Sequence, residues 1–433
     1  MKYRIREKNE LKPSGVEWLG DIPKDWNISK LKFISNIVMG QSPSSTSYND
    51  KEIGLPLIQG NADCKDRLTL PRNFTSEITK VCNIGDIILT VRAPVGAVSK
   101  SLHHACIGRG VCSINSKKNN QFLYYYLIFH EKLWGKFTQG SIYESVSIDV
   151  ISNTKIPFIN IIEQQKIADF LDEKSKIFDE AISKKEQLIS KLELAKQSLI
   201  SEVVTGKLKI VEQNSKLQTI KREQKELKPS GVEWLGNIPK DWKVKKSKYL
   251  FEIRKRIAGI LGFDVLSITQ KGIKIKDIET GGGQLSMDYS KYQIVNIGDF
   301  AMNHMDLLTG FVDIAKSQGV TSPDYRVFSL VDKNSDSIYY LYLFQMGYKN
   351  QIFFAFGQGS SQLGRWRFPT EEFNKFYFPY PSLEEQQKIS RYLDKKLIHF
   401  DNTIEKTKQS ITKLKEAKEA LISQAVTGKI EVL

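Results

Sequence analysis

The chain has 433 residues, which is more than one ordinary hydrophobic core accommodates and indicates roughly two to four domains. Hydrophobic residues make up 40% and aromatic residues 10%, a composition that excludes an intrinsically disordered chain. The 64 basic and 49 acidic residues leave a net charge of +15, which favours a polyanionic partner, nucleic acid before an anionic membrane surface.

The N-terminal segment lacks the apolar core of a signal peptide, and no stretch approaches the roughly 18 apolar residues of a transmembrane helix. The 4 cysteines lack the close spacing of a disulfide framework or a zinc site. We therefore expect a cytoplasmic protein that does not associate with a membrane.

The first predicted element is a lead-in segment that occurs twice. Residues 11–26 and 227–242 share 15 of 16 positions at an offset of 216. A second repeat follows, because residues 163–207 return at 385–429 with 25 of 45 positions identical and an offset of 222. This period is far too long for a solenoid or a propeller, so it indicates that a whole domain pair was duplicated.

Between the repeated segments lie two inserts that have largely diverged. Short runs of β-branched and aromatic residues bounded by Gly, Pro and Asn, as at 85–96 and 325–331, predict strands. The aromatic stretches 124–137 and 339–354 predict one buried helix in each insert. We expect a mixed α+β globule from each.

The two inserts keep a few common anchors. Asn-Ile-Gly-Asp occurs at 83–86 and 296–299, and a Gly-Ser pair occurs at 140–141 and 359–360. The offsets between these anchors, 213 and 219, differ from those of the repeated segments, so the loops between anchors differ in length. This pattern predicts one fold that carries two different sets of binding loops.

The stretches 160–205 and 382–427 predict two long helices with a narrow apolar seam, since apolar residues recur at alternating steps of four and three. Gly206 and Gly428 are placed to cap the two helices at their C-terminal ends. Each seam needs a partner, and the other copy is the obvious one. The seam residues are Leu171, Phe178, Ile182, Ile189, Leu192, Leu199 and Val203 in the first helix and Leu393, Leu397, Phe400, Ile404, Ile411, Leu414, Leu421 and Ala425 in the second.

The expected fold class is therefore α+β, with two globular mixed α/β domains separated by two long antiparallel coiled-coil helices in a pseudo-two-fold internal repeat. The alternative is that each helix packs only on its own globule. The expected domains are the first globule at 1–159, the first helix at 160–207, a polar linker at 208–226, the second globule at 227–381 and the second helix at 382–433.

Motifs for catalysis are missing from the sequence. There is no GxxxxGK[ST] phosphate loop, and the Asn/Asp-Pro-Pro-aromatic turn of adenine methyltransferases does not occur. The 5 histidines show no metal-ligand spacing. We predict no catalytic residue and no metal site.

Basic and amide side chains cluster instead in the loop-like parts of each insert. Arg and Lys bind guanine edges and phosphates, and Asn and Gln bind adenine, so these clusters predict DNA contact rather than ordinary solvated loops. The candidates are Gln59, Asn61, Arg92, Lys100, His103, His104, Arg109, Gln139, Ser141 and Ser145 in the first insert and Gln270, Lys271, Lys274, Asn303, His304, Gln358, Ser360, Ser361, Gln362, Arg365, Trp366 and Arg367 in the second.

This layout resembles the DNA-specificity subunit of type I restriction–modification systems. The resemblance rests on Trp-Leu-Gly-x-Ile-Pro-x-Asp-Trp at 18–26 and 234–242, and on Glu-Gln-Gln-Lys-Ile at 163–167 and 385–389. It covers nearly the whole chain. It implies that the inserts are target-recognition domains and that the helices are conserved spacer regions.

The resemblance also implies a division of labour. Each target-recognition domain would read one half of a bipartite site on double-stranded DNA, and the helices would act as a spacer ruler and a docking surface. This chain would bind no cofactor and catalyse nothing. Two methyltransferase subunits would use S-adenosylmethionine, and restriction and translocation subunits would use ATP and magnesium.

Two rival functions compete with this interpretation. A stand-alone DNA-modifying enzyme would show turnover on DNA with magnesium or a methyl donor in the absence of partners. A coiled-coil scaffold that binds only protein would fail to retain random duplex DNA at low salt.

Overall fold

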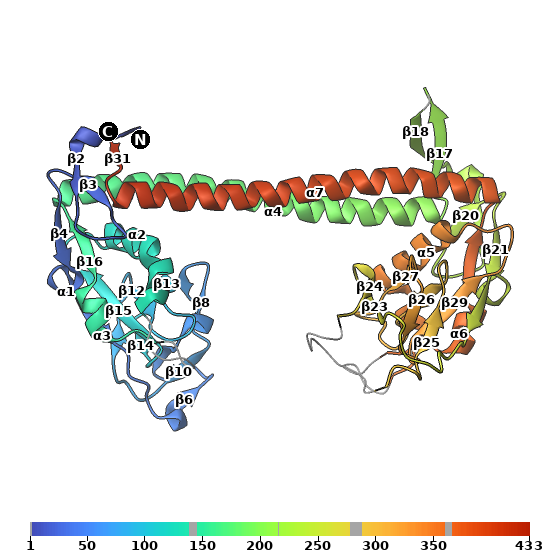
Figure 1. Cartoon of the computed structure of the whole chain (residues 1–433), viewed down its shortest axis with the longest axis horizontal. Helices are drawn as coiled ribbons and strands as arrows, with labels where there is room; N and C mark the ends of the chain where they lie inside the picture. Colours follow the sequence, from blue (N-terminus) through green and yellow to red (C-terminus); the bar gives the residue numbers. More distant parts are fainter. Residues whose placement is uncertain (1, 138–144, 215, 278–287, 360–365) are drawn as a thin grey trace. The chain divides into compact units, whose positions relative to one another are not determined.

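The computed structural model describes the chain as two compact units (Figure 1). Unit 1 comprises Met1–Glu186 and Lys408–Leu433, and unit 2 comprises Gln187–Thr407. Each unit therefore combines one globule with a part of both long helices. The described residues are 2–137, 145–214, 216–277, 288–359 and 366–433.

Unit 1 contains short strands, a few short helices and 3₁₀ turns before the first long helix. Its helices are α1 (Leu31–Ile34), α2 (Asn120–His130), α3 (Ile148–Asn153) and the start of α4 (Ile161–Val204), with 3₁₀ turns at Lys8–Glu10, Ser45–Ser47, Asn61–Asp63 and Glu131–Phe137. Its strands are β1 (Tyr3–Ile5), β2 (Leu11–Pro13), β3 (Asp21–Pro23), β4 (Asn27–Lys30), β5 (Ser35–Met39), β6 (Tyr48–Asn49), β7 (Leu55–Ile58), β8 (Cys64–Lys65), β9 (Leu68–Thr69), β10 (Asn73–Thr75), β11 (Val81–Cys82), β12 (Ile87–Thr90), β13 (Val98–Lys100), β14 (Ala105–Ile107), β15 (Val111–Ser116), β16 (Lys155–Phe158) and β31 (Ile430–Val432).

Unit 2 repeats this plan with fewer strands in its globule. Its helices are α5 (Ser337–Lys349), α6 (Thr370–Lys375) and the first part of α7 (Leu383–Val426), with 3₁₀ turns at Gln224–Glu226, Ser247–Tyr249 and Ile352–Phe356. Its strands are β17 (Leu208–Gln213), β18 (Lys216–Lys221), β19 (Leu227–Pro229), β20 (Asn237–Pro239), β21 (Lys243–Lys246), β22 (Phe251–Arg254), β23 (Leu266–Thr269), β24 (Gly272–Ile275), β25 (Gln293–Val295), β26 (Phe300–Met302), β27 (Val312–Ile314), β28 (Gly319–Thr321), β29 (Arg326–Leu330) and β30 (Tyr377–Tyr380).

The first four strands of the central sheet follow an equivalent order in the two units. Among the described residues the sheet runs β5-β15-β12-β13-β9-β8 in unit 1 and β22-β29-β26-β27 in unit 2. A second sheet of unit 1, β11-β14-β7-β10-β6, corresponds in part to the β25–β28 pair of unit 2. The predicted α+β class and the predicted internal repeat are therefore confirmed.

The shared Asn-Ile-Gly-Asp anchors close a turn that leads into the central strand of each sheet. The carboxylate of Asp86 accepts a hydrogen bond from the backbone N–H of Asn83 at 2.8 Å, and that of Asp299 accepts one from Asn296 at 2.9 Å. Ser113 and Ser329 on the neighbouring strands donate to the same carboxylates. Because each carboxylate is buried and fully engaged, the motif has a structural role.

The predicted buried helices begin earlier than expected. The structure starts α2 at Asn120 because the Asn119 side chain accepts the N–H of Phe122, and it starts α5 at Ser337 because Asp336 caps Tyr339 in the same way. Both helices end before the predicted limits, and 3₁₀ turns at Glu131–Phe137 and Ile352–Phe356 occupy the rest.

The two long helices pack together within each unit and run antiparallel. In unit 1, the first turns of α4 and the last turns of α7 share one hydrophobic core, and Lys418 binds Asp179 at 2.7 Å. In unit 2, the end of α4 and the start of α7 share the other core, and Lys196 binds Asp401 at 2.6 Å. The seam residues that form these contacts are buried or half-buried, as the heptad pattern predicted.

The glycines after the long helices cap them as expected. Gly206 has φ +78° and Gly428 has φ +72°, the left-handed conformation of a C-terminal cap. A side chain on Gly428 would collide with the ring of Pro23, and one on Gly206 with the ring of Pro239. The end of each helix thus rests against a repeated lead-in segment, which explains why both segments stayed alike.

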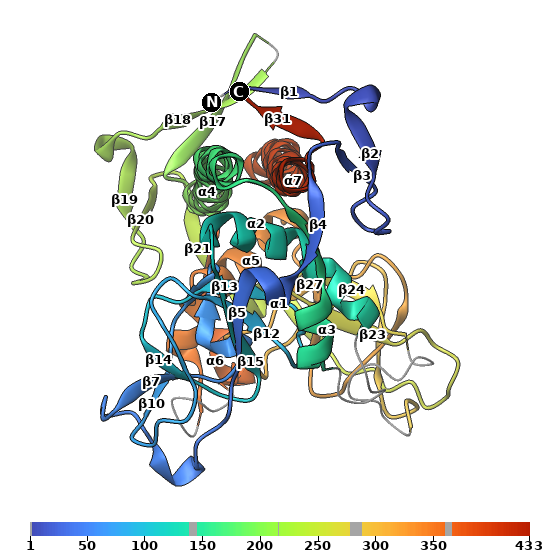
Figure 2. The ribbon, with the colours of Figure 1, turned by 90° about the vertical axis from the view of Figure 1, so that its left-hand side faces the viewer.

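Most of the predicted linker at 208–226 forms strands. The structure forms it into an antiparallel hairpin of β17 and β18, in which Leu208 faces Lys221 and Gln213 faces Lys216. In unit 1 the same position is taken by β1 and β31, which Figure 2 shows side by side near the two ends of the chain. The polar composition hid a strand alternation, so the hairpin was not predicted, and the assignment of 208–226 as the linker between the copies stays a prediction.

The compact units also cut across the predicted domain limits, because each half of a long helix packs on a globule. The limits at 159, 207, 226 and 381 remain a prediction about sequence domains. In the part of the chain that the structure describes, no helix is long and apolar enough to cross a membrane.

Candidate nucleic-acid interface

Two arginines of unit 1 differ from all its others in having no carboxylate partner among the described residues. Unit 1 contains six arginines, and four of them form ion pairs: Arg4 with Glu10, Arg6 with Glu163, Arg67 with Glu131 and Arg72 with Asp63. Arg92 and Arg109 form none with any described carboxylate, and both are exposed. An exposed guanidinium that the fold leaves unpaired is available to an external anion or base.

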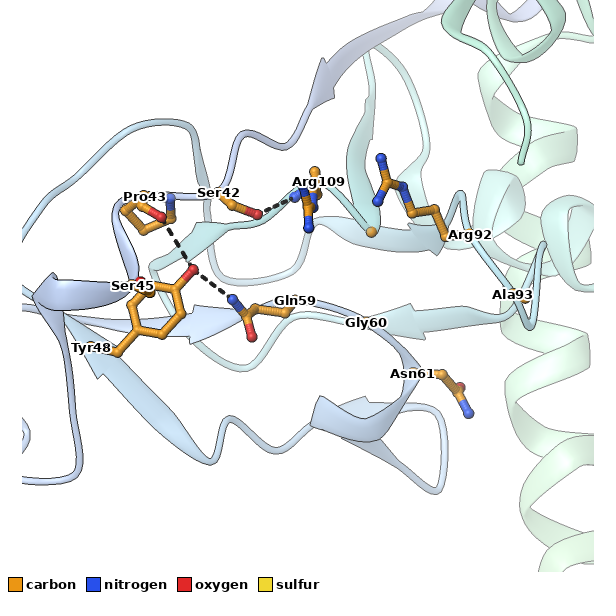
Figure 3. Close-up of a pocket in the computed structure, with 11 residues that line it drawn as sticks. Ser42, Pro43, Ser45, Tyr48, Gln59, Gly60, Asn61, Arg92, Ala93 and Arg109 are labelled. Carbon is orange, nitrogen blue, oxygen red and sulfur yellow. Dashed lines mark hydrogen bonds between the residues drawn. The ribbon is translucent and has the colours of Figure 1, made fainter. Parts of the chain in front are cut away.

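These two arginines lie on one concavity of about 620 Å³, which Figure 3 shows in close-up. Gln59 and Asn61 lie on the same surface, and Ser145 pairs with the backbone of Arg92 as an isolated bridge at its edge. Five candidates that are far apart in sequence are thus brought together. The complete lining is Ser42, Pro43, Ser45, Tyr48, Gln59, Gly60, Asn61, Arg92, Ala93, Arg109 and Gly110.

The Gln59 amide has a defined orientation. Its Nε2 donates to the hydroxyl of Tyr48 at 2.8 Å, and that hydroxyl donates to the carbonyl oxygen of Pro43 at 3.2 Å. The Gln59 backbone N–H is held by the buried carboxylate of Asp63 at 2.8 Å. One amide hydrogen and the carbonyl oxygen of Gln59 therefore stay available.

The segment that carries Arg109 packs closely against neighbouring backbone at glycine positions. A side chain on Gly40 would collide with the carbonyl oxygen of Gly108, and one on Gly110 would collide with that of Gln59. These close approaches let the N–H of Gly108 donate to Ile58 at 2.8 Å. The N–H of Arg109 donates to the Ser42 hydroxyl at 3.1 Å.

Three other candidates of unit 1 lie away from the concavity. Lys100 donates to the Gln121 side chain and sits 4.5 Å from the ring centre of Tyr124 on α2, where burial lowers the pKa of its ammonium group. His103 bonds the Thr69 hydroxyl, and His104 bonds the Asn83 side chain, each at 3.1 Å. Their contacts tie the globule together, and their DNA contact stays a prediction. Gln139 and Ser141 lie outside the described residues.

Of the described arginines of unit 2 that form no ion pair with a described carboxylate, two lie in the insert and one lies on α7. Arg222, Arg254 and Arg256 form ion pairs with Glu385, Glu252 and Asp299. Arg326 and Arg367 form none with a described carboxylate, and neither does Arg391 on α7. Arg326 is 3% exposed, and burial lowers its pKa to about 10.

Around Arg326 lie several buried polar atoms without a described hydrogen-bond partner. His304 is 6% exposed, and its burial beside Arg326 and Arg367 lowers its pKa to about 3. Asn303 Oδ1, His304 Nδ1, Arg326 Nη1 and Trp366 Nε1 are buried and unpaired. The backbones of Gln358 and Arg367 pair as an isolated bridge, and Trp366 packs on Phe354 at 4.5 Å between ring centres.

The remaining candidates of unit 2 divide into two groups. Gln270, Lys271 and Lys274 lie on the hairpin of β23 and β24, where all three are exposed. Ser360, Ser361, Gln362 and Arg365 lie outside the described residues. No described group of three or more His, Cys, Asp or Glu side chains is arranged to hold a metal ion.

Sequence reasoning missed Ser42, Tyr48 and Arg326. The Gly-Arg-Gly string at 108–110 was a usable signal, since two glycines around one arginine indicate a close backbone approach. Arg326 gave none, because it opens an apolar strand and is buried.

Comparison with known proteins places these sites in a family. Residues 23–194 and 239–416 each match the type I restriction modification DNA specificity domain. A putative type I restriction enzyme MjaX specificity subunit of Methanocaldococcus jannaschii is 34% identical over 198 residues. That match covers 44% of this chain, and the chain spans only 45% of the length of that relative.

Two further likenesses extend over almost the whole chain. The type I restriction enzyme EcoBI specificity subunit of Escherichia coli is 19% identical over 456 residues, covering 97% of this chain and 90% of that protein. A structure solved in work on complex assembly and conformational transition of the type I R-M system covers 94% of this chain and 99% of its own, with a TM-score of 0.68 and 15% identity. The last likeness shows a shared fold. The two family matches span most of the sequence, and the chain therefore belongs to the family of type I restriction modification DNA specificity domains, of which it carries two copies.

Proposed function

We propose that this chain is the non-catalytic DNA-specificity subunit of a type I restriction–modification complex. Each unit reads one half of a bipartite site on double-stranded DNA, and the half-sites differ in sequence because the inserts differ. The methyl transfer and the cleavage belong to other subunits, which supply S-adenosylmethionine, ATP and magnesium.

One observation carries this proposal. Among the described residues of unit 1, the guanidinium groups without a carboxylate partner are those of Arg92 and Arg109, and both lie on the concavity of the diverged insert. Arg6 and its repeat equivalent Arg222 are ion-paired instead. Exposed guanidinium groups gathered on one concavity of a diverged insert suit anion and base recognition.

The net charge of +15 supports the same partner. Lysine and arginine contacts to phosphates release counterions, so binding of the complex to duplex DNA weakens steeply with salt. We place the protein in the cytoplasm, with two methyltransferase subunits docked on equivalent surfaces of the two copies and with restriction subunits joining them.

Methylation mapping of host DNA tests this function. With the chain present, a motif with two unlike parts and a constant gap is expected, and deletion of the chain should remove that motif alone. Persistence of every methylated motif after deletion would contradict the proposal. Methylation by the purified chain without partners would favour a stand-alone enzyme.

We propose further that the lengths of α4 and α7 set the gap between the half-sites. Inserting seven residues into each helix, between Asp179 and Lys196 in α4 and between Asp401 and Lys418 in α7, adds roughly 10 Å of helix. At 3.4 Å per base pair this corresponds to about three base pairs. Mapping should show a longer gap with both half-sites unchanged, and an unchanged gap would exclude the helices as the ruler.

A further inference from the structure

We infer that Arg109 reads a guanine in the half-site bound by unit 1, whereas Arg92 on the same concavity contacts a phosphate. The inference rests on the proposed function and extends it, because it names a base. It also assigns different tasks to two arginines that the sequence identifies only as candidate DNA contacts. Both belong to the concavity lined by Gln59 and Asn61.

The first step is that Arg109 projects from a fixed backbone. The N–H of Gly108 donates to Ile58 and that of Val91 donates to Gly110, at 2.8 and 2.9 Å. With the Arg109 N–H bonded to Ser42 at 3.1 Å, each residue of the 108–110 segment is tied to a different part of the unit. Gly108 and Gly110 are buried, so Arg109 is a single exposed residue on a buried support.

The second step is the contrast with Arg92. Arg92, Ala93 and Pro94 form a run of three exposed residues that begins two residues after β12. The bridge to Ser145 ties this run on one side. The Arg92 guanidinium therefore has room to adjust to a phosphate. A phosphate contact positions the duplex and tolerates variation in geometry.

The third step concerns what a guanidinium carried by a fixed backbone recognises. Guanine presents O6 and N7 in the major groove, and arginine binds both at once only when its two N–H groups are aligned with them. A preorganised support reduces the ordering cost of that alignment and penalises other bases. No other base pair offers two acceptors at these positions.

Gln59 strengthens the assignment, since it is a second oriented group beside the first. Gln59 packs against Gly108, because a Cβ atom placed on that glycine would lie 3.3 Å from the Gln59 Cγ. The hydrogen bond to Tyr48 orients the Gln59 amide. Fixed hydrogen-bonding groups side by side are what base-edge recognition requires, whereas phosphate binding does not need the Gln59–Tyr48–Pro43 chain.

The test uses the whole complex, purified from its host by affinity capture of this chain, and duplexes that carry the mapped site. Arg109→Ala should lose preference at one G·C position in one half-site by roughly 5- to 150-fold, with the other half unchanged. Arg92→Ala should weaken binding to all sequences alike and reduce the magnitude of the salt slope by about 1. Arg4→Ala, which removes an exposed arginine paired with Glu10, is the matched control and should change neither.

An atomic substitution in the DNA makes the test independent of the variant's folding. Replacing the guanine by 7-deazaguanine removes N7 alone, and the wild-type complex should lose affinity at that position. The Arg109→Ala complex should lose nothing further, because the contact is already gone. If this variant fails to assemble, Arg109→Lys keeps the charge, and its bidentate contact should still be lost.

Retained preference at every G·C position in Arg109→Ala, or equal 7-deazaguanine losses in variant and wild type, would overturn the inference and leave the proposed function standing. A wild-type complex that selects no bipartite site would overturn the proposed function itself.

Discussion

Unit 1 and unit 2 share the same ion pairs but have different candidate DNA contacts. Lys418 and Asp179 in unit 1 meet at 2.7 Å, and their repeat equivalents Lys196 and Asp401 in unit 2 meet at 2.6 Å. Arg6–Glu163 likewise recurs as Arg222–Glu385, at 3.1 and 2.8 Å. The repeated sequence thus encodes one set of contacts used twice, and the candidate DNA contacts lie in the inserts.

The inserts differ even at equivalent core positions. Strand register places Cys112 opposite Leu89 in unit 1 and Arg326 opposite Met302 in unit 2. Alignment of the Asn-Ile-Gly-Asp anchors likewise equates Val91 with His304. A core position that is apolar in one copy and cationic in the other shows that the fold tolerates a buried charge where hydrogen bonds, such as those from Arg326 to Phe368 and Thr370, partly satisfy it.

The largest expected effect tests whether the frame is equivalent in both units. Trp26 and Trp242 are each 1% exposed and pack against the glycine that caps a long helix. Trp26→Ala should destabilise unit 1, and Trp242→Ala unit 2, each by about 3–5 kcal/mol, because each leaves a large cavity. Urea unfolding measures both, and a cost below about 1 kcal/mol in either unit would contradict equal packing.

A smaller effect is a loss of stability in acid, which unit 2 owes to His304 and unit 1 to His130, a core histidine whose pKa burial lowers to about 4. His304 is neutral when folded, with a pKa of about 3, so acid protonates the unfolded chain first and removes stability as pH falls from about 6.5 toward 3. This linkage costs unit 2 roughly 2 kcal/mol at pH 5 relative to pH 7. His304→Val, which copies unit 1, should flatten that part of the pH profile of unfolding. An unchanged profile would show that His304 is not buried as a neutral group.

The smallest effect concerns the paired surface charges of the helices. The lysines of the two pairs are 24% and 27% exposed and the aspartates 62% and 60%, so solvent screens both alike. Double-mutant cycles on Lys418–Asp179 and on Lys196–Asp401 should each give a coupling of about 0.2–1 kcal/mol. Coupling in one unit only would break the equivalence of the two copies.

The sequence was sufficient to predict the long helices because their signals are local. The seven-residue seam and the glycines at 206 and 428 specify length, partner and end. The β17–β18 hairpin escaped prediction because its alternation is carried by few apolar residues among many lysines. The early start of α2 depended on the Asn119 cap, which composition alone does not reveal.

The candidate site was predictable by residue type but not by position. Arg92 and Arg109 were chosen together with Lys100 and His103, and only the fold separates them. The separation depends on which backbone segments cross, at Gly40, Gly108 and Gly110. Such crossings are long-range contacts that one sequence without structure does not encode in readable form.

The pairing of β1 with β31 has a consequence for synthesis on the ribosome. The backbone N–H of Leu433 donates to the Lys2 carbonyl at 3.0 Å, and Ile422 and Val426 of α7 belong to the same hydrophobic core as the α4 face of Ile167 and Leu171. Unit 1 is therefore begun first and completed last. At 5–20 residues per second, translation of 187–407 leaves that face uncovered for roughly 10–45 s. The nascent chain thus exposes an apolar face of α4, to which chaperones can bind, until the C-terminal part of α7 and β31 are synthesised. Unit 2 is contiguous in sequence, so its core can form without this delay.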